Sequence, residues 1–303
     1  MKNNAPLRIK SISEFHEFRG LPKPEHPLIS VIDYSLIKYN PDMNNFIQDF
    51  YSISLKRTTN AKIKYGQQQY DFDSGVLFFL APNQVLSIIP NNQSEILHTG
   101  WLLLIHPDFL WNTSLASSIG KYEYFDYAIN EALFLSDKEE TILNNIIQNI
   151  KQEYYSNLDK FSQSIIISQL ETLLNYSERF YQRQFITRRI SNHQVLERLE
   201  KLLNDYFKKS LPEKGIPTVQ YVAQSLNVSP SYLSSLLKSI TGQNTQQHIH
   251  NKIIELAKEK LSTTSLSVSQ IAYELGFEHS QSFNKLFKSK TSKTPLEFRA
   301  SFN

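Results

Sequence analysis

The chain has 303 residues, of which 40% are hydrophobic and 20% charged, and its formal net charge is +3. At about 150 residues per domain, this length predicts two domains. The sequence contains no cysteine, which excludes disulfides, thiolate catalysis and cysteine-ligated metals. No apolar run approaches the roughly 20 residues that span a bilayer, and the first ten residues lack a signal-peptide core. We therefore expect a cytoplasmic protein with no membrane association.

The net charge is unevenly distributed along the chain. Residues 187–303 hold 16 Lys and Arg against 9 Asp and Glu, a balance of +7. Residues 1–186 hold the other 16 basic residues and 20 acidic ones, a balance of −4. A basic part that follows an acidic part predicts two tasks, the second of them on a polyanion. Chance fluctuation over a hundred residues is the alternative.

Residues 1–135 predict β-structure. Short runs rich in Val, Ile, Tyr, Phe and Thr recur between residues 27 and 111, separated by turn clusters at residues 40–42, 73–75, 82–83 and 90–92. Many short strands at this spacing predict a sandwich or a small barrel. Four aromatic residues within them are candidates for a ligand pocket, although most such side chains pack in a core. They are Tyr34, Tyr51, Phe78 and Trp101.

Residues 136–186 change to a helical period. Ser136 and Glu139 form the pattern of a capping box, and apolar residues at helical spacing follow it. We expect helices over about 137–156 and 162–182. They either cover the β-structure or pair with a second copy, and we favour a homodimer, because two copies would reach paired sites on a target. The boundary to the last domain is expected within residues 184–192.

Residues 187–303 predict only helices and contain a duplicated unit. Residues 218–242 and 267–292 superimpose when one extra residue is allowed in the second turn. In each copy a small residue, Ala223 or Ala272, precedes a turn residue suited to positive φ, Asn227 or Gly276. This pattern is typical of a helix-turn-helix, and a helical hairpin that only packs is the alternative. The duplication and the basic balance favour binding to double-stranded DNA.

Residues 271–299, IAYELGFEHSQSFNKLFKSKTSKTPLEFR, resemble the second helix-turn-helix unit of AraC/XylS-family transcription regulators. A looser resemblance at residues 70–88 extends to the cupin-like sensing domain of that family. The resemblance implies an α+β multidomain protein with a cupin-like β-barrel or sandwich and flanking helices in front of an all-α double helix-turn-helix domain. It also implies a sequence-specific factor that regulates transcription initiation with RNA polymerase as a partner, under the control of a small-molecule effector.

By match to the family, the second helix of each unit faces the major groove. Its candidates for base contacts are Ser231, Ser234, Ser235, Ser280, Gln281, Ser282 and Lys285, and the candidates for phosphate contacts are Lys238, Lys288 and Thr294. The chain departs from the family pattern at three residues. Ser292 stands where a glycine is usual, and Ser235 and Lys285 stand where the family often has an arginine, which contacts guanine in a bidentate geometry.

Two other functions are alternatives. A metal-dependent cupin enzyme needs clustered ligands, but His16, His26, His98 and His106 form no His-x-His pair, while His248 and His250 diverge on a helix. The eight glycines lie at least nine residues apart, so no glycine-rich phosphate loop is present. We therefore expect no enzyme, cofactor or metal site. A DNA-binding factor that responds to no ligand is the second alternative.

Overall fold

The computed structural model describes residues 6–37, 45–58, 64–65, 68–69, 75–87, 98–128, 131–156, 159–187, 189–209 and 215–301. The chain divides into two compact units, Met1–Gln184 and Phe185–Asn303. The turns expected at residues 40–42 and 90–92 lie outside the described residues, as do residues 73–74 and parts of the 70–88 segment. None of the described helices combines the length and the apolar character needed to cross a membrane.

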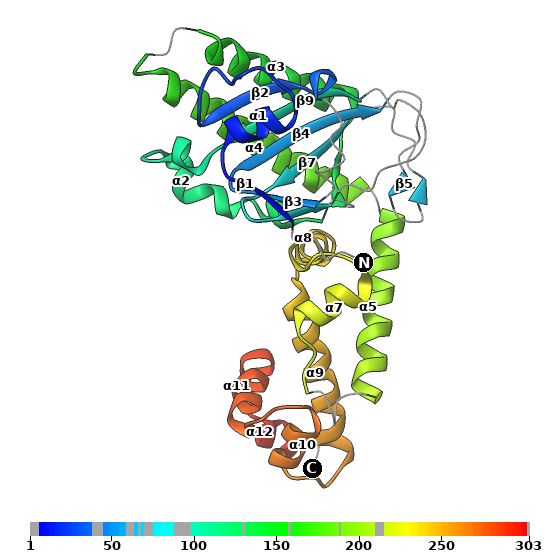
Figure 1. The fold of residues 1–303 in the computed structure, drawn as a ribbon. Coiled ribbons are helices and arrows are strands. Elements are labelled where there is room, and N and C mark those ends of the chain that lie inside the picture. Colours follow the sequence, from blue (N-terminus) through cyan, green and yellow to red (C-terminus); the bar gives the residue numbers. More distant parts are fainter. Residues whose placement is uncertain are drawn as a thin grey trace. The chain divides into compact units, whose positions relative to one another are not determined.

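The elements of the first unit are mainly strands, followed by two long helices (Figure 1). The strands are β1 (Leu7–Ile9), β2 (Ile29–Asp33), β3 (Asn45–Gln48), β4 (Tyr51–Thr58), β5 (Lys64–Tyr65), β6 (Gln68–Gln69), β7 (Val76–Leu80), β8 (Val85–Ser87), β9 (His98–Ile105) and β10 (Leu133–Phe134). The helices are α1 (Ile12–Phe18), α2 (Ser114–Ser118), α3 (Asp137–Tyr154) and α4 (Ser162–Thr187), with short 3-10 turns η1 (Tyr34–Leu36), η3 (Pro107–Leu110), η4 (Ile119–Lys121) and η5 (Glu123–Asp126).

The strands form a five-stranded sheet in the order β10-β7-β4-β9-β2, a three-stranded sheet β1-β3-β8 and a two-stranded ribbon β5-β6. All neighbours in the five-stranded sheet are antiparallel. The N-terminal unit is therefore sheet-rich, as the strand-like runs predicted. The closed cupin barrel stays a prediction, because the described strands belong to separate sheets.

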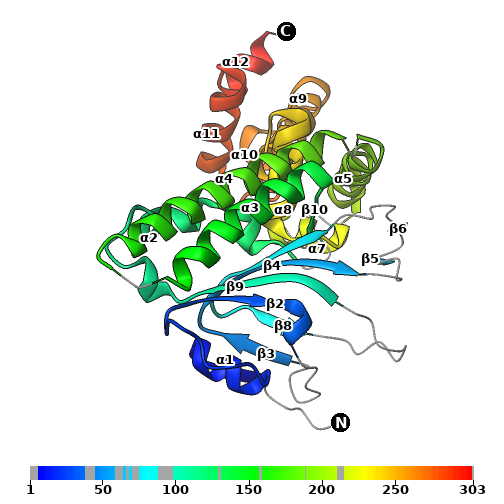
Figure 2. The same cartoon turned by 90° about the horizontal axis from the view of Figure 1, so that it is seen from above.

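The two faces of the five-stranded sheet are covered by different elements (Figure 2). Side chains alternate along each strand, and Trp101 shares a face with Leu55, its cross-strand partner. On this face the indole Nε1 of Trp101 donates to Asn144 Oδ1 of α3 at 2.9 Å. The opposite face packs against α1, β1 and β3 through a buried cluster that includes Phe15 and Leu104.

Helices α3 and α4 occur where the helical spacing predicted them. The Ser136–Glu139 capping box is present with both of its hydrogen bonds, because these contacts need only residues three positions apart. One face of α3 is buried through four aliphatic side chains, Leu143, Ile146, Ile147 and Ile150. The two helices thus cover a sheet, and their pairing with a second copy stays a prediction.

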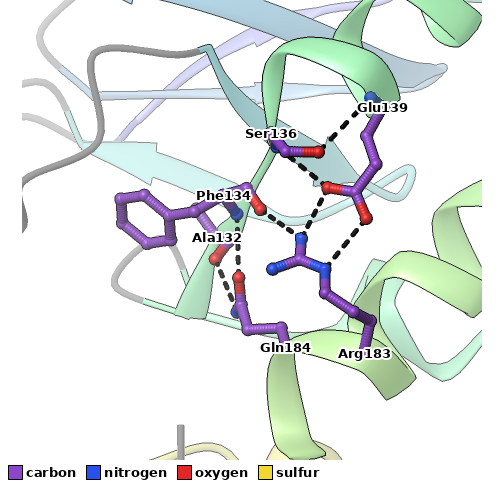
Figure 3. Close-up of polar contacts among 6 residues, drawn as sticks. All are labelled: Ala132, Phe134, Ser136, Glu139, Arg183 and Gln184. Atoms are coloured by element: carbon purple, nitrogen blue, oxygen red, sulfur yellow. Dashed lines mark hydrogen bonds and ion pairs between the residues drawn. The ribbon is translucent and has the colours of Figure 1, made fainter. Parts of the chain in front are cut away.

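The last turn of α4 within the first unit is fixed to the outer edge of β10 (Figure 3). Gln184 Oε1 accepts from the N–H of Phe134 at 2.9 Å, while its Nε2 donates to the carbonyl of Ala132 at 3.2 Å. Arg183 donates to the carbonyl of Phe134 at 2.7 Å and pairs with Glu139 at 2.8 Å. These side chains satisfy backbone groups that an edge strand otherwise leaves unpaired.

Helices are the only regular secondary structure among the described residues of the second unit. Its helices are α5 (Arg189–Lys209), α7 (Val219–Leu226), α8 (Pro230–Thr241), α9 (Thr245–Thr263), α10 (Val268–Glu274), α11 (Ser280–Thr291) and α12 (Pro295–Ala300). One hydrophobic cluster joins them, from Leu199 of α5 through Ile253 of α9 to Phe287 of α11. The all-α expectation for this part of the chain is confirmed.

Candidate nucleic-acid interface

The two helix-turn-helix units have the same first turn. The N–H of Val228 donates to the carbonyl of Ala223, and the N–H of Phe277 donates to the carbonyl of Ala272, both at 3.1 Å. The predicted positive-φ residues Asn227 (φ 59°) and Gly276 (φ 82°) lie in these turns. The two small alanines are fully buried, so the second helix of each unit can approach closely.

The choice of glycine in one turn and asparagine in the other has a local cause. A Cβ atom built on Gly276 would lie 3.0 Å from the backbone of Gly215, which is tighter than an ordinary van der Waals contact. Asn227, in the other turn, is exposed. Asparagine tolerates the left-handed region, so glycine is needed only where the backbone of residue 215 approaches.

The duplication extends beyond the segments matched in the sequence. Gly242 (φ 76°) and Ser292 (φ 61°) are both left-handed, and each N–H donates to the lysine carbonyl four residues earlier at 2.9 Å. A capping box then starts the next helix in each copy, at Asn244 for α9 and at Thr294 for α12. The segments matched in the sequence end at Gly242 and Ser292, and the capping box lies just beyond each of them. Ser292 adopts the turn despite the absence of glycine.

Helix α11 presents a polar stripe opposite its buried face. Phe283 and Phe287 are fully buried. At 100° per residue, Gln281, Lys285 and Lys288 lie within about 60° of one another on the other side, and all three are exposed. We call these three residues the α11 stripe.

Further polar residues flank the α11 stripe. The predicted Ser282 is exposed on one flank, while the predicted Ser280 is half-buried at the start of the helix. Two exposed flanking residues were missed by the sequence analysis, Asn284 and Ser289. Both could have been predicted from the helical repeat, because Asn284 directly precedes Lys285 and Ser289 follows it by four residues.

Helix α8 carries a different set of side chains at the equivalent positions. Ser231, Ser235 and Lys238 occupy the places of the α11 stripe, and we call them the α8 stripe. Both serines are half-buried, and Lys238 is exposed. Ser234 makes a hydroxyl–hydroxyl contact of 3.3 Å with Thr245. Because Thr245 is fully buried in α9, this contact directs Ser234 toward the helix packing.

Thr294, a candidate for a phosphate contact, serves the fold first. Its hydroxyl accepts the N–H of Glu297 at 3.2 Å as the N-cap of α12. This bond uses an acceptor lone pair and leaves the hydroxyl proton available for a phosphate oxygen. Arg299, in the same helix, donates to the carbonyls of Leu261 and Leu266 at 3.2 and 2.6 Å. The position of α12 beside the end of α9 and the loop that follows it is therefore fixed by side-chain hydrogen bonds.

Helix α9 connects the two helix-turn-helix units and is joined to α11 by side-chain hydrogen bonds. Lys290 Nζ donates to Asn251 Oδ1 at 3.1 Å, and Asn251 Nδ2 donates to Gln243 Oε1 at 2.7 Å. Ile249, Ile253 and Ala257 of α9 are fully buried, as its apolar spacing predicts. A rigid joint of this kind holds two recognition helices at a fixed separation.

The four aromatic residues expected at a ligand pocket fall into two pairs. Tyr34 and Phe78 lie 4.9 and 5.8 Å, measured to their ring centres, from Lys56 Nζ. Tyr51 instead contacts Phe125 with ring centres 5.2 Å apart, and Trp101 lies on the sheet face that α3 covers. The four side chains therefore do not surround one space, because the alternation of the strands places them on opposite faces. Their role in ligand binding stays a prediction for the pair beside Lys56.

Within the described residues, no three His, Asp or Glu side chains come together in an arrangement that could hold a metal ion. Burial lowers the pKa of His16, whose ring contacts Ser30 Oγ at 2.9 Å. Burial likewise lowers the pKa of His26. These side chains are accounted for by packing.

A family model described as a helix-turn-helix domain matches residues 222–301. An uncharacterized HTH-type transcriptional regulator from Pseudoalteromonas carrageenovora is 34% identical over 117 residues, which cover 38% of this chain and 64% of that protein. The chain thus spans less than two thirds of this relative's length. The regulatory protein SoxS of Salmonella typhimurium is 24% identical over 110 residues, 36% of this chain and 97% of that protein. The C-terminal domain of the response regulator yesN from Fusobacterium nucleatum matches 33% of this chain and 96% of that structure at 30% identity and a TM-score of 0.29.

Proposed function

We propose that the chain is a member of the AraC family and that the whole protein is a sequence-specific DNA-binding regulator of transcription initiation. The match of a helix-turn-helix family model to residues 222–301 supports the proposal. The observation that carries the proposal is the duplicated unit itself. Two copies share their turns, their buried alanines and the capping box that follows each second helix, and the second presents a basic and amide-bearing stripe on α11. Relatives described as regulators match 117 and 110 residues of the chain.

We assign the residues of the stripes by their chemistry. Lys285 suits the O6 and N7 acceptors of a guanine, and Gln281 suits the edge of an adenine. Lys288 and Lys238 suit phosphates, which position the protein without reading sequence. Ser231, Ser235, Ser280, Ser282 and Thr294 supply short hydroxyl contacts. Ser234 is the weakest of the base-contact candidates because of its contact with Thr245.

We assign residues 1–135 to a cupin-like sensing domain, residues 136–186 to helices that join two copies in a homodimer, and residues 187–303 to DNA binding. In this proposal the protein is not an enzyme. It acts in the cytoplasm, where RNA polymerase is its partner. The hydrogen bonds between β10 and α4 support this arrangement. A ligand that displaces the sheet would displace the helix from which the chain continues into the second unit.

Selection of bound fragments from random DNA with the full-length protein tests the proposal. We expect enrichment of one motif with paired elements about one helical turn apart. A variant in which the α11 stripe is replaced by alanine is the matched control, since its three exposed side chains contribute no core packing. Enrichment of no motif by the wild-type protein, or of the same motif by the control, would contradict sequence-specific binding through α11.

A further inference from the structure

Lys290 is a basic residue of α11 that lies outside the α11 stripe. At 100° per residue, Lys290 stands about 180° from Gln281 of the stripe and about 20° from Phe283, which is fully buried. Its Nζ donates to Oδ1 of Asn251 in α9 at 3.1 Å. Because the α11 stripe is the side proposed to face DNA, Lys290 is directed toward α9 and not toward the major groove.

Asn251 joins Lys290 to the turn that follows α8. An ammonium group only donates hydrogen bonds, so Oδ1 of Asn251 must face Lys290 and its Nδ2 is left for another partner. That Nδ2 donates to Gln243 Oε1 at 2.7 Å. The backbone N–H of Gln243 donates to the hydroxyl of Thr241 at 3.2 Å, and this hydroxyl donates to the carbonyl of Leu237 at 2.7 Å. A continuous series of hydrogen bonds therefore links the end of α11 to the end of α8. We call Lys290, Asn251 and Gln243 the Lys290 bridge.

The equivalent position of the first helix-turn-helix unit carries no polar residue. Ile240 of α8 takes the place of Lys290 in the matched segments, and it packs against the hydrophobic core of the second structural unit. The helix-turn-helix fold itself thus needs no lysine at this position. The contact of Lys290 with α9 points to a role between the two helix-turn-helix units rather than within one of them.

Lys290 has no carboxylate partner among the residues that the structure describes. Lys252 of α9, by contrast, pairs with Glu255 at 2.9 Å. Burial, and after it the charge of Lys290, lowers the pKa of His250, so this neighbouring imidazole is uncharged at neutral pH and does not repel the ammonium group. The amide of Asn251 is therefore the group that holds the Lys290 side chain. A contact with a DNA phosphate is the alternative role for such a lysine.

We propose that Lys290 is a positioning residue, which through Asn251 and Gln243 holds α8 and α11 at the separation at which both contact one DNA duplex. The apolar contacts of α9 with its neighbours have no fixed direction, whereas hydrogen bonds are directional. Fixing the two helices before binding raises the effective concentration of the second contact once the first is made. This inference rests on the proposed function, and it adds to that function the residues that let both helix-turn-helix units act together.

Anisotropy titrations of the full-length protein with two duplexes of equal length test the inference. In the first duplex the element that α11 contacts is central. In the second it stands at the end, so that the DNA on the side of α8 is absent. The ratio of the two affinities measures the contribution of the first helix-turn-helix unit. We expect Lys290→Met and Asn251→Ala each to reduce this ratio by about two- to tenfold, which corresponds to the net contribution of one hydrogen bond.

Two further variants provide the controls. Lys290→Arg keeps a cation with N–H donors at this position and should keep the wild-type ratio. Lys201→Met removes an exposed lysine of α5 and should also keep it. Combining Lys290→Met with Asn251→Ala should reduce the ratio no further than either change alone, because both remove the same hydrogen bond. Full additivity of the two substitutions would overturn the inference.

Salt dependence separates positioning from a phosphate contact. If Lys290 contacted a phosphate, Lys290→Met would weaken binding to both duplexes equally and reduce the slope of log affinity against log salt by about one unit. We expect a slope equal to that of Lys201→Met and a loss of affinity confined to the first duplex. Equal losses on both duplexes, with a reduced slope, would overturn the inference.

The same titrations distinguish failure of this inference from failure of the proposed function. A ratio that neither Lys290→Met nor Asn251→Ala changes contradicts the inference, while sequence-specific binding stands. A wild-type protein that binds no selected site more tightly than random DNA contradicts the proposed function and the inference with it. Lys290 and Asn251 are both exposed, so we expect the variants to fold, and thermal unfolding of each checks this. If Lys290→Met does not fold, Asn251→Ala decides by the same ratio.

Discussion

The two helix-turn-helix units share the conformation of their turns but carry different side chains at two of the three equivalent stripe positions. Where α11 carries Gln281, Lys285 and Lys288, α8 carries Ser231, Ser235 and Lys238. Long basic and amide side chains reach base edges and phosphates, whereas serine reaches only short hydroxyl contacts. The two copies can therefore have different roles. We expect the second helix-turn-helix unit to read the DNA sequence and the first to contribute mainly to position and affinity.

The largest effect that tests this division is expected at the central position of the stripes. Lys285→Ala should weaken binding to the selected site by about 1–3 kcal/mol and relax the preference at one base pair. Ser235→Ala, at the equivalent position of α8, should change affinity by much less. Fluorescence anisotropy with the selected site and its single-base variants measures both. Equal losses of affinity across all DNA sequences would reassign Lys285 to a contact with the DNA backbone. Equal effects of the two substitutions would contradict the different roles of α8 and α11.

The first turns offer a second test, this time of stability. Gly276→Asn copies the first unit's turn into the second unit, but its Cβ would meet the backbone of Gly215 at 3.0 Å. Such overpacking should lower the free energy of unfolding by about 1–3 kcal/mol. The reverse change, Asn227→Gly, should be close to neutral, because Asn227 is exposed in its turn. Chemical denaturation compares the two, and equal effects would show that the close approach does not select the glycine.

The second turns differ by a smaller amount. Ser292→Gly should stabilise the protein by about 1 kcal/mol, because glycine adopts the left-handed region without the steric cost of a Cβ. Gly242→Ser should destabilise it by a similar amount. Nothing lies within 4 Å of a Cβ built on Gly242, so backbone strain alone decides the sign. Thermal melts of both variants against the wild type measure the pair, and shifts of the same sign would contradict the assignment.

The sequence predicted those features that depend on neighbours within a few residues. The cap at Ser136 and the positive-φ residues Asn227 and Gly276 follow from side-chain and backbone chemistry over three or four positions. The α11 stripe follows from the helical repeat in the same way.

Features that depend on distant partners were not predictable from the sequence. The contact of Ser234 with Thr245 is set by the packing of α8 on α9. The separation of Tyr34 and Phe78 from Tyr51 and Trp101 is set by strand register and order. Local patterns do not encode either of these, because both arise from pairing between segments far apart in the chain.

The smallest expected effect concerns the one position where the two stripes agree. Lys238 and Lys288 are equivalent, exposed lysines near the ends of α8 and α11. If each neutralises one phosphate, Lys238→Ala and Lys288→Ala should each reduce the slope of log affinity against log salt by about one unit. Neither substitution should change the base preference, since phosphate contacts carry no sequence information. Anisotropy titrations over a series of salt concentrations measure the slopes, with Lys201→Ala, an exposed lysine of α5, as the control. A reduced slope for Lys288→Ala alone would show that only the second helix-turn-helix unit contacts DNA phosphates. Equal reductions for both variants would show that both helix-turn-helix units contact the DNA backbone, although only one of them reads the bases.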